Sequence, residues 1–143
     1  MQLTHLLEAK GRSVEAIDAA SSVRTAVDLL GRKGIGALVV TTPSDPLAGI
    51  LSERDVVRAL SVEGAGALDA PVSALMTTEV VTCPSTTTVT ELMSVMTEQR
   101  IRHVPVVDDG ELVGIVSIGD VVKSRISELE GDRRDLLDYV GAR

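Results

Sequence analysis

The feature that most constrains the fold of this chain is an internal repeat. The segment 49–55, Gly-Ile-Leu-Ser-Glu-Arg-Asp, returns 65 residues later at 114–120 as Gly-Ile-Val-Ser-Ile-Gly-Asp. Two apolar patterns upstream also recur, at an offset of 66: residues 23–30 match 89–96, and residues 35–40 match 101–106. We therefore expect two similar units. Because a unit of this size buries little apolar surface by itself, the two are expected to pack as one module.

Each unit is predicted to have the order β-α-β-β-α, which makes the chain an α+β protein. Apolar residues at i, i+3, i+4 and i+7 predict amphipathic helices, and nearly unbroken apolar runs predict strands that are buried on both faces. Serine and threonine residues precede these helices, as N-caps do. The expected strands are 13–17, 37–41, 47–52, 79–83, 103–107 and 112–117. The expected helices begin near residues 23, 53, 72, 89 and 118.

The repeat also predicts how the chain is divided. The expected parts are a first repeat at 1–61, a linker at 62–71, a second repeat at 72–130 and a helical tail at 131–143. Glycine and alanine alternate in the linker, which is typical of a flexible segment. An apolar lead-in at Leu3, Leu6 and Leu7 corresponds to the short helix that begins near residue 72.

The tail has a pattern of its own. Leu136, Leu137 and Val140 stand at helical spacing and would form one apolar face. Such a face could cover an edge of the core or a partner subunit. Amphipathic tails do both, so the two interpretations stay open.

The repeated Ser-x-x-Asp motif has two physical interpretations. The serine ends a strand and begins a helix, where free N–H groups and the helix dipole attract an anion such as phosphate. The carboxylates of Asp55 and Asp120 only accept hydrogen bonds, which suits the vicinal hydroxyls of a ribose. The same spacing is that of a capping box, which needs no ligand. Spacing alone does not choose between a ligand site and a duplicated helix cap.

Composition argues against several classes of function. The net charge of −7 opposes binding to nucleic acid, and the absence of Phe and Trp removes the platforms on which single-stranded bases stack. No apolar run approaches the ~18 residues of a membrane span. The start of the chain lacks the pattern of a secretory signal, and the lone Cys83 cannot form an internal disulfide. We expect a cytoplasmic protein with no nucleic-acid or membrane partner.

The sequence marks no catalytic or metal-binding arrangement. Its two histidines are far apart, and no cluster of histidine and cysteine suggests a zinc site. A Cys83–His103 pair would need an orienting group and an oxyanion site, which nothing in the sequence marks. The glycine-rich segments match neither a P-loop nor a dinucleotide-binding fingerprint. We expect no enzyme activity, no metal site and no obligatory cofactor.

Four segments in order resemble the cystathionine-β-synthase (CBS) domain family. They are residues 35–40, 49–55, 100–107 and 114–120. The chain is similar over residues 3–129 to a stand-alone pair of CBS domains, known as a Bateman module. The resemblance implies two tandem CBS repeats related by a pseudo-twofold axis. It also implies adenine nucleotides bound in clefts between the repeats, and a homodimer in which four repeats form a flat disc.

The resemblance implies roles for particular residues. Asp55 and Asp120 would hold ribose hydroxyls, while Ser52 and Ser117 would contact phosphate or ribose. Adenine would lie against the first strand of a unit and against the start of its second strand. The complete set implied for nucleotide binding is Val14, Ala16, Ile35, Gly36, Ala37, Ser52, Arg54, Asp55, Val80, Val81, Thr82, Arg102, His103, Pro105, Ser117 and Asp120.

The basic pair that is implied to reach the ligand phosphates is present only once. Arg102 and His103 match this pair, whereas the corresponding residues of the first repeat are Gly36 and Ala37. We therefore expect two unequal sites, one of which binds weakly or stays empty. Without a ligand, His103 is equally consistent with a structural histidine, and most exposed arginines such as Arg54 are solvated surface charges.

Two functions follow as hypotheses. The first is a non-catalytic regulatory module that binds AMP, ADP or ATP, with NAD and S-adenosylmethionine as further candidates. The ligand would shift the population of conformations and so signal its presence to a partner, such as a regulated enzyme. The second is a constitutive interaction protein, in which the Ser/Asp pairs are only helix caps and a partner enzyme is modulated without a ligand.

Overall fold

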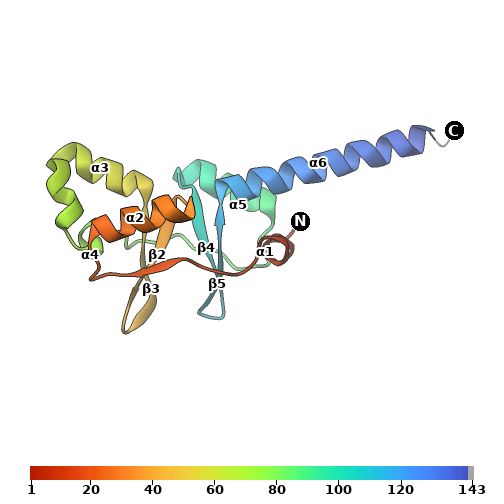
Figure 1. Cartoon of the computed structure of the whole chain (residues 1–143). Coiled ribbons are helices and arrows are strands. Elements are labelled where there is room, and N and C mark those ends of the chain that lie inside the picture. The colour runs from red at the N-terminus through yellow and green to blue at the C-terminus, as the bar shows by residue number, and fades with distance from the viewer. Residues whose placement is uncertain (142–143) are drawn as a thin grey trace. The chain divides into compact units, whose positions relative to one another are not determined.

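The computed structural model describes residues 1–141, which form two compact units. The first-repeat unit consists of Ser13–Val81. The second-repeat unit combines Met1–Arg12 with the chain from Thr82 onward. Each unit has its own cluster of buried apolar side chains, and both are mixtures of helices and strands (Figure 1). The predicted α+β class with two repeats is thereby confirmed.

The first-repeat unit contains a sheet of three strands in the order β1-β2-β3. Strand β1 pairs parallel with β2, and β2 pairs antiparallel with β3. The strands are β1 (Ala16–Asp18), β2 (Ala37–Thr42) and β3 (Asp45–Ser52). The helices are α2 (Val23–Lys33), α3 (Glu53–Glu63), the 3-10 helix η1 (Gly64–Asp69) and α4 (Val72–Leu75).

The second-repeat unit is built around an antiparallel pair of strands. These are β4 (His103–Asp108) and β5 (Glu111–Ser117). The helices of this unit are α1 (Leu3–Lys10), α5 (Val89–Gln99) and α6 (Ile118–Gly141). In both units the long predicted helices begin where polar caps are found, since the side chains of Ser22 and Thr88 accept hydrogen bonds from the third helical amide.

The strand predicted at 79–83 is wrong. Only Cys83 pairs with a strand: its N–H donates to the carbonyl of Pro105 at 3.2 Å, and its own carbonyl accepts from Val107 at 2.9 Å. A hydrogen bond from the N–H of Val80 to the carbonyl of Thr78 bends the chain before it can pair further. Pro84 has no N–H with which to continue the pairing. The corresponding prediction at 13–17 succeeded in part, as β1.

The lead-in helices are exchanged between the repeats. The N–H of Leu3, at the start of α1, donates to the carbonyl of Thr87, so α1 packs with the second repeat. The N–H of Val72, at the start of α4, donates to the carbonyl of Ser21, so α4 packs with the first repeat. Each compact unit therefore contains the lead-in that precedes the other repeat.

The segment that was predicted to be a flexible linker, residues 62–71, is largely helical. Helix α3 continues to Glu63, and η1 follows it directly. Ala67 is only 1% exposed, and the carbonyl of Ala70 accepts a hydrogen bond from Val23. Buried apolar contacts and a satisfied backbone hold this segment against α2, although its glycines favour flexibility.

The predicted last helix and the predicted tail are one continuous helix, α6. The end of the predicted tail, Ala142 and Arg143, lies outside the described residues. Figure 1 shows that α6 extends well beyond the other elements of its unit. All residues from Asp132 to Gly141 are exposed, so this part of α6 does not cover an edge of the core.

Candidate functional site

The first Ser/Asp pair forms a complete capping box at the start of α3. The N–H of Asp55 donates to Oγ of Ser52 at 3.3 Å, and the N–H of Ser52 donates to Oδ2 of Asp55 at 2.9 Å. The hydroxyl of Ser52 also lies 3.1 Å from the same carboxylate oxygen. Such reciprocal bonds satisfy two donors at a helix start and stabilise it without a ligand.

The second Ser/Asp pair has the same geometry at the start of α6. The N–H of Ser117 donates to Oδ2 of Asp120 at 2.9 Å, and the N–H of Asp120 donates to Oγ of Ser117 at 3.1 Å. The capping interpretation of the motif is thus confirmed in both repeats. It does not exclude a ligand, because each carboxylate has a second oxygen and about four acceptor sites in all.

The strand register places the other motif residues beside each capping box. Ala37 of β2 pairs with Ser52 of β3, and the N–H of Glu53 donates to the carbonyl of Gly36 at 2.9 Å. The structure therefore brings the start of the second strand in the repeat to the start of the helix. We call the group formed by Gly36, Ala37, Ser52 and Asp55 the Asp55 cluster.

The second repeat reproduces this arrangement with different chemistry. His103 of β4 pairs with Ser117 of β5, and the N–H of Ile118 donates to the carbonyl of Arg102 at 2.8 Å. We call the group formed by Arg102, His103, Ser117 and Asp120 the Asp120 cluster. It has two basic residues where the Asp55 cluster has none, and the unequal binding expected from this difference stays a prediction.

Lys10 adds a further cation to the Asp120 cluster. Its ammonium group lies 2.5 Å from Oδ2 of Asp120 and donates to the carbonyl of Ile115 at 2.6 Å. Partial burial by itself raises the pKa of the Asp120 carboxyl, but hydrogen bonds from Lys10 and Ser117 and the charge of Lys10 lower that pKa overall. Asp120 therefore favours the ionised form, which is the form that accepts hydrogen bonds.

The corresponding contact in the first repeat is neutral. Oδ1 of Asp55 accepts a hydrogen bond of 3.4 Å from the hydroxyl of Thr77. This bond is long and is made to an exposed hydroxyl, so a ligand can replace it at little cost. Neither Lys10 nor Thr77 was assigned a role from the sequence. Lys10 and Asp120 are 110 residues apart, so no local pattern could have linked them.

The lengths of the lead-in helices explain this difference. Leu7 of α1 packs against Gly114, and Met76, just after α4, packs against Gly49. The two lead-ins thus sit at the same place in their units. Helix α1 has 8 residues and carries Lys10 on to Asp120, whereas α4 has 4 residues. After α4 the chain extends and pairs Thr77 with Ile50.

The remaining predicted site residues are divided between the units. In the first-repeat unit, Val14, Ile35, Val80 and Val81 are partly buried, and Ala16 and Arg54 are exposed. In the second-repeat unit, Thr82 is exposed and Pro105 is buried within β4. The apolar members are positioned by their backbones rather than by polar contacts. No functional role for them follows from their geometry alone.

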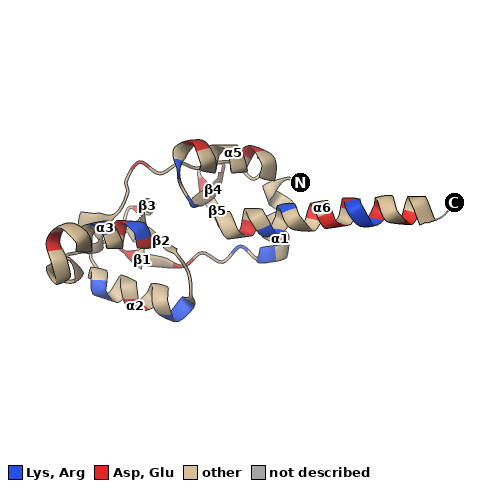
Figure 2. Cartoon of the chain, turned by 90° about the horizontal axis from the view of Figure 1, so that it is seen from above, with Lys and Arg blue, Asp and Glu red and all other residues tan. Residues whose placement is uncertain are grey.

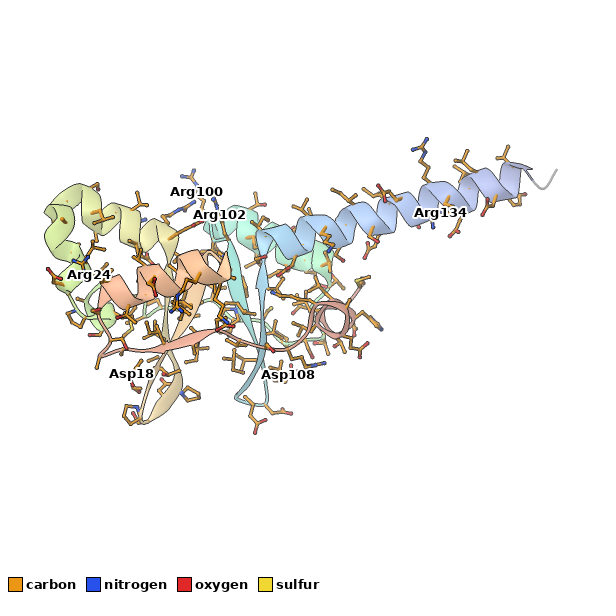
Figure 3. All side chains as sticks on the ribbon, viewed as in Figure 1. Asp18, Arg24, Arg100, Arg102, Asp108 and Arg134 are labelled. Carbon is orange, nitrogen blue, oxygen red and sulfur yellow. The ribbon has the colours of Figure 1, made fainter. Side chains whose placement is uncertain are left out.

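The basic residues of the second repeat gather near the start of β4. Figure 3 shows Arg100 and Arg102 there, with Asp108 near the other end of the strand. Arg100 has φ 55° at the C-cap of α5, in the left-handed region, where the first repeat has Gly34 with φ 63°. A non-glycine residue in this conformation is strained. Its position places a second arginine two residues before Arg102 in the chain.

Cys83 behaves as a small apolar residue. It packs against the core cluster of its unit, and burial raises the pKa of its thiol, with Asp108 adding to the rise and Thr87 opposing it. The described residues contain no group of three or more His, Cys, Asp or Glu side chains placed to hold a metal ion. Within residues 1–141, no helix is both long and apolar enough to cross a membrane.

Comparison with known proteins gives the family. The model of the CBS domain matches residues 11–62 and 72–127. The CBS-domain containing protein ATU1752 from Agrobacterium tumefaciens is 44% identical, with a TM-score of 0.85 over 87% of this chain and 92% of that one. CBS domain-containing protein CBSX3, mitochondrial, from Arabidopsis thaliana is 34% identical over 96% of this chain and 71% of the relative.

Among the solved relatives, one that was determined with AMP is similar over most of its length. The CBS domain protein PAE2072 from Pyrobaculum aerophilum, complexed with AMP, is 28% identical, with a TM-score of 0.72 over 84% of this chain and 89% of that one. The match to the family model and the similarity of the folds agree with the internal repeat of the sequence. The chain belongs to the CBS domain family and contains two CBS repeats.

Proposed function

We propose that this chain is a non-catalytic regulatory module that binds an adenine nucleotide and signals its occupancy to a partner. The observation that carries the proposal is the complex of a CBS relative with AMP, taken with an aspartate beside a serine at two helix starts in this chain. AMP, ADP and ATP are the main candidates, with NAD and S-adenosylmethionine as further ones. The nucleotide acts as a regulatory ligand and not as an obligatory cofactor.

The Asp120 cluster is the better candidate for a phosphorylated ligand. The carboxylate of Asp120 accepts the ribose hydroxyls, for which Oδ1 is available beside the capped Oδ2. Arg102 and His103 stand next to it and attract the phosphate, since guanidinium groups match phosphate oxygens well. With Lys10 included, this cluster has the greater positive charge in a chain whose net charge is −7.

The Asp55 cluster is the better candidate for a weaker or less charged ligand. Asp55 supplies the same ribose acceptor, and its partner Thr77 is readily displaced. The neighbouring residues are Gly36 and Ala37, which contribute no charge. With no Phe or Trp in the chain, adenine is held between aliphatic side chains, for which Val14, Ile35, Val80 and Val81 are candidates.

Nucleotide binding would regulate the partner by changing the relative populations of the protein's conformations. A ligand that binds one conformation or one dimer geometry more tightly shifts the equilibrium toward it by the ratio of the two affinities. We propose a homodimer and a regulated enzyme as the assembly that responds, and a cytoplasmic location. Nucleic acid and membrane are not among the proposed partners, because the net negative charge opposes binding to nucleic acid and to anionic lipid surfaces.

The direct test is calorimetric titration of the purified protein after nucleotides have been stripped from it. AMP, ATP and NAD are titrated separately, with inosine monophosphate as a control for recognition of adenine. We expect saturable binding of at least one adenine nucleotide. The absence of heat up to millimolar concentrations of all three, in protein shown to be folded by circular dichroism, would contradict the proposal.

A second candidate function is a constitutive interaction module. The observation that favours it is that both capping boxes are complete without a ligand. In this case the Ser/Asp pairs contribute only stability, and millimolar AMP or ATP leaves the melting temperature unchanged. A nucleotide that binds only the folded state increases the free energy of unfolding by about 2.7 kcal/mol at a hundredfold excess over Kd, and so raises the melting temperature. A thermal shift with nucleotide therefore separates the two functions.

A further inference from the structure

In the first repeat, Thr77 supplies the hydrogen bonds to two acceptors near the junction of β3 and α3. Its N–H donates to the carbonyl of Ile50 at 2.8 Å, and its hydroxyl donates to Oδ1 of Asp55 at 3.4 Å. The N–H of Ile50 donates in turn to the carbonyl of Thr77 at 3.0 Å. The chain that follows α4 therefore pairs with the edge of β3 and offers Asp55 a neutral donor.

In the second repeat, one ammonium group donates to both of the corresponding acceptors. These are the carbonyl of Ile115 and the carboxylate of Asp120, each 65 residues after its counterpart in the first repeat. Nζ of Lys10 lies 2.6 Å from the carbonyl oxygen of Ile115 and 2.5 Å from Oδ2 of Asp120. Lys10 therefore takes the place of Thr77. The same place in the two repeats is neutral in one and positively charged in the other.

The position of Lys10 is set by the packing of α1. Leu7 is fully buried against Gly114, and Lys10 follows it by three residues, so both side chains lie on one face of the helix. Figure 2 shows a basic segment at the end of α1 beside an acidic segment at the start of α6. The side chain of Lys10 is 31% exposed and that of Asp120 is 25% exposed. Salt therefore screens this pair less than it screens fully exposed charges.

Lys10 changes the charge balance at the start of α6. Residues 53–55 at the start of α3, Glu-Arg-Asp, and residues 118–120 at the start of α6, Ile-Gly-Asp, have the same formal charge of one negative unit. In the second repeat Lys10 neutralises this charge, and Arg102 makes the sum positive. In the first repeat the corresponding residues, Thr77 and Gly36, add no charge. The two clusters thus differ by two charges because of two positions.

This difference matters for a ligand that joins a ribose to a phosphate. A carboxylate that accepts the ribose hydroxyls also repels a phosphate on the same ribose, because like charges in proximity oppose binding. The ammonium group of Lys10 removes this repulsion where it arises. An ammonium group has three N–H donors, and the two bonds of Lys10 to Ile115 and Asp120 leave the third for a phosphate oxygen. Asp55 has no such counter-ion in Thr77.

We propose that Lys10 is a specificity-determining residue that makes the Asp120 cluster select phosphorylated adenosine over uncharged adenosine. This role rests on the proposed function, because it requires that the Asp120 cluster binds the ribose of an adenine nucleotide. Thr77, at the same place in the first repeat, leaves the Asp55 cluster without this selectivity. Lys10 acts on the choice of ligand, while Asp120 holds the ribose.

The selectivity is measured as the ratio of the dissociation constant of adenosine to that of AMP. Both ligands are titrated calorimetrically into the full chain, stripped of nucleotide and carrying Asp55→Asn so that the heat comes mainly from the Asp120 cluster. We expect Lys10→Met to lower the ratio about tenfold by weakening AMP alone, and Lys10→Arg to keep most of it. A lysine that only stabilises the end of α1 would affect both ligands alike.

Lys33→Met is the matched control, because it removes the same charge from a lysine that pairs with Glu15 in the first-repeat unit. We expect it to leave the ratio unchanged. An unchanged ratio in Lys10→Met, or an equal fall in Lys33→Met, would overturn the role of Lys10. Absence of binding of both ligands to the wild type would instead contradict the proposed function on which this role rests.

The reciprocal variant, Thr77→Lys, tests the same role without altering Lys10. Residue 77 is exposed, and its backbone bonds to Ile50 do not depend on its side chain, so the fold should be retained. In a chain carrying Asp120→Asn, we expect Thr77→Lys to raise the ratio of the two dissociation constants about tenfold. A folded Thr77→Lys variant with an unchanged ratio would show that a charge at this place does not set the selectivity.

Discussion

The ammonium group of Lys10 lies 2.5 Å from a carboxylate oxygen of Asp120, across 110 residues of sequence. The corresponding carboxylate in the first repeat, Asp55, has a neutral hydroxyl from Thr77 as its partner. A duplicated motif has thus acquired two different electrostatic surroundings. The cause is the length of the exchanged lead-in helix, and the consequence is that the two clusters differ in charge before any ligand binds.

The Lys10–Asp120 pair should contribute a pH-dependent part of the stability. Because the pKa of Asp120 is lowered in the folded state, its contribution is present above the unfolded pKa of about 3.9 and is lost as the pH falls through the lower folded value. Lys10→Met should lower the free energy of unfolding by about 0.5–1 kcal/mol at pH 7. The loss should shrink below pH 4. Urea unfolding at pH 7 and pH 3 measures this.

The control for this prediction is Lys33→Met. Nζ of Lys33 lies 3.8 Å from Oε1 of Glu15, and both of these side chains are more exposed than those of Lys10 and Asp120. Replacing Lys33 should change the free energy of unfolding by less than replacing Lys10 does, since exposed ion pairs contribute little. A loss for Lys10→Met that is the same at pH 7 and pH 3 would show that the lysine stabilises by packing and not through the carboxylate.

Two glycines of the repeated motif should tolerate alanine unequally. A Cβ at Gly49 would lie 2.7 Å from the backbone carbonyl oxygen of Thr77, whereas one at Gly114 would lie 2.7 Å from Cδ2 of Leu7. A backbone atom can move away from the added Cβ less easily than the end of a flexible side chain can. Gly49→Ala should therefore lower the unfolding free energy by about 1–3 kcal/mol, and Gly114→Ala by less. Chemical denaturation of both variants gives the comparison, and a reversed order would contradict the packing of the lead-ins.

Alanine substitutions at two glycines of α2, one at its C-cap and one inside the helix, should separate the effect of backbone strain from that of helix propensity. Gly34 has φ 63°, so Gly34→Ala should lower the unfolding free energy by about 1 kcal/mol, although no atom lies within 4 Å of the added Cβ. Gly31, inside α2, also has open space around it, and Gly31→Ala should raise the stability by about 0.5–1 kcal/mol. Thermal unfolding of the two variants should move in opposite directions. A shift of the same sign in both would contradict the assigned cap.

Much of the fold could be predicted from local patterns. The helical periodicity and caps located α2 and α5, and the paired apolar runs located both hairpins, because these signals depend on neighbouring residues. The strand at 79–83 was wrong because a few apolar residues do not reveal that a turn and Pro84 leave only Cys83 paired. The exchange of α1 and α4 could not be predicted, since it depends on contacts between segments that are far apart in sequence.

The candidate site shows the same division. The Ser-x-x-Asp spacing allowed two interpretations, and the structure shows the capping boxes that one of them predicts. That the two repeats bind a ligand unequally, as the difference between Gly36-Ala37 and Arg102-His103 suggests, stays a prediction. Lys10 was missed as a member of the site. Its position is set by the length of α1 and by the packing of Leu7 on Gly114, which no local pattern records.

We propose that the Asp120 cluster binds adenine nucleotides more tightly than the Asp55 cluster does. Calorimetric titration of AMP into the wild type, Asp55→Asn and Asp120→Asn tests this most directly. Asparagine keeps one oxygen for the capping bond but replaces the other acceptor, so the fold is retained while ribose binding is impaired. Asp108→Asn, at the far end of β4, is the control. We predict at least tenfold weaker binding for Asp120→Asn, a smaller loss for Asp55→Asn and none for the control. Equal losses for the two site variants, or no effect of Asp120→Asn, would contradict the claim.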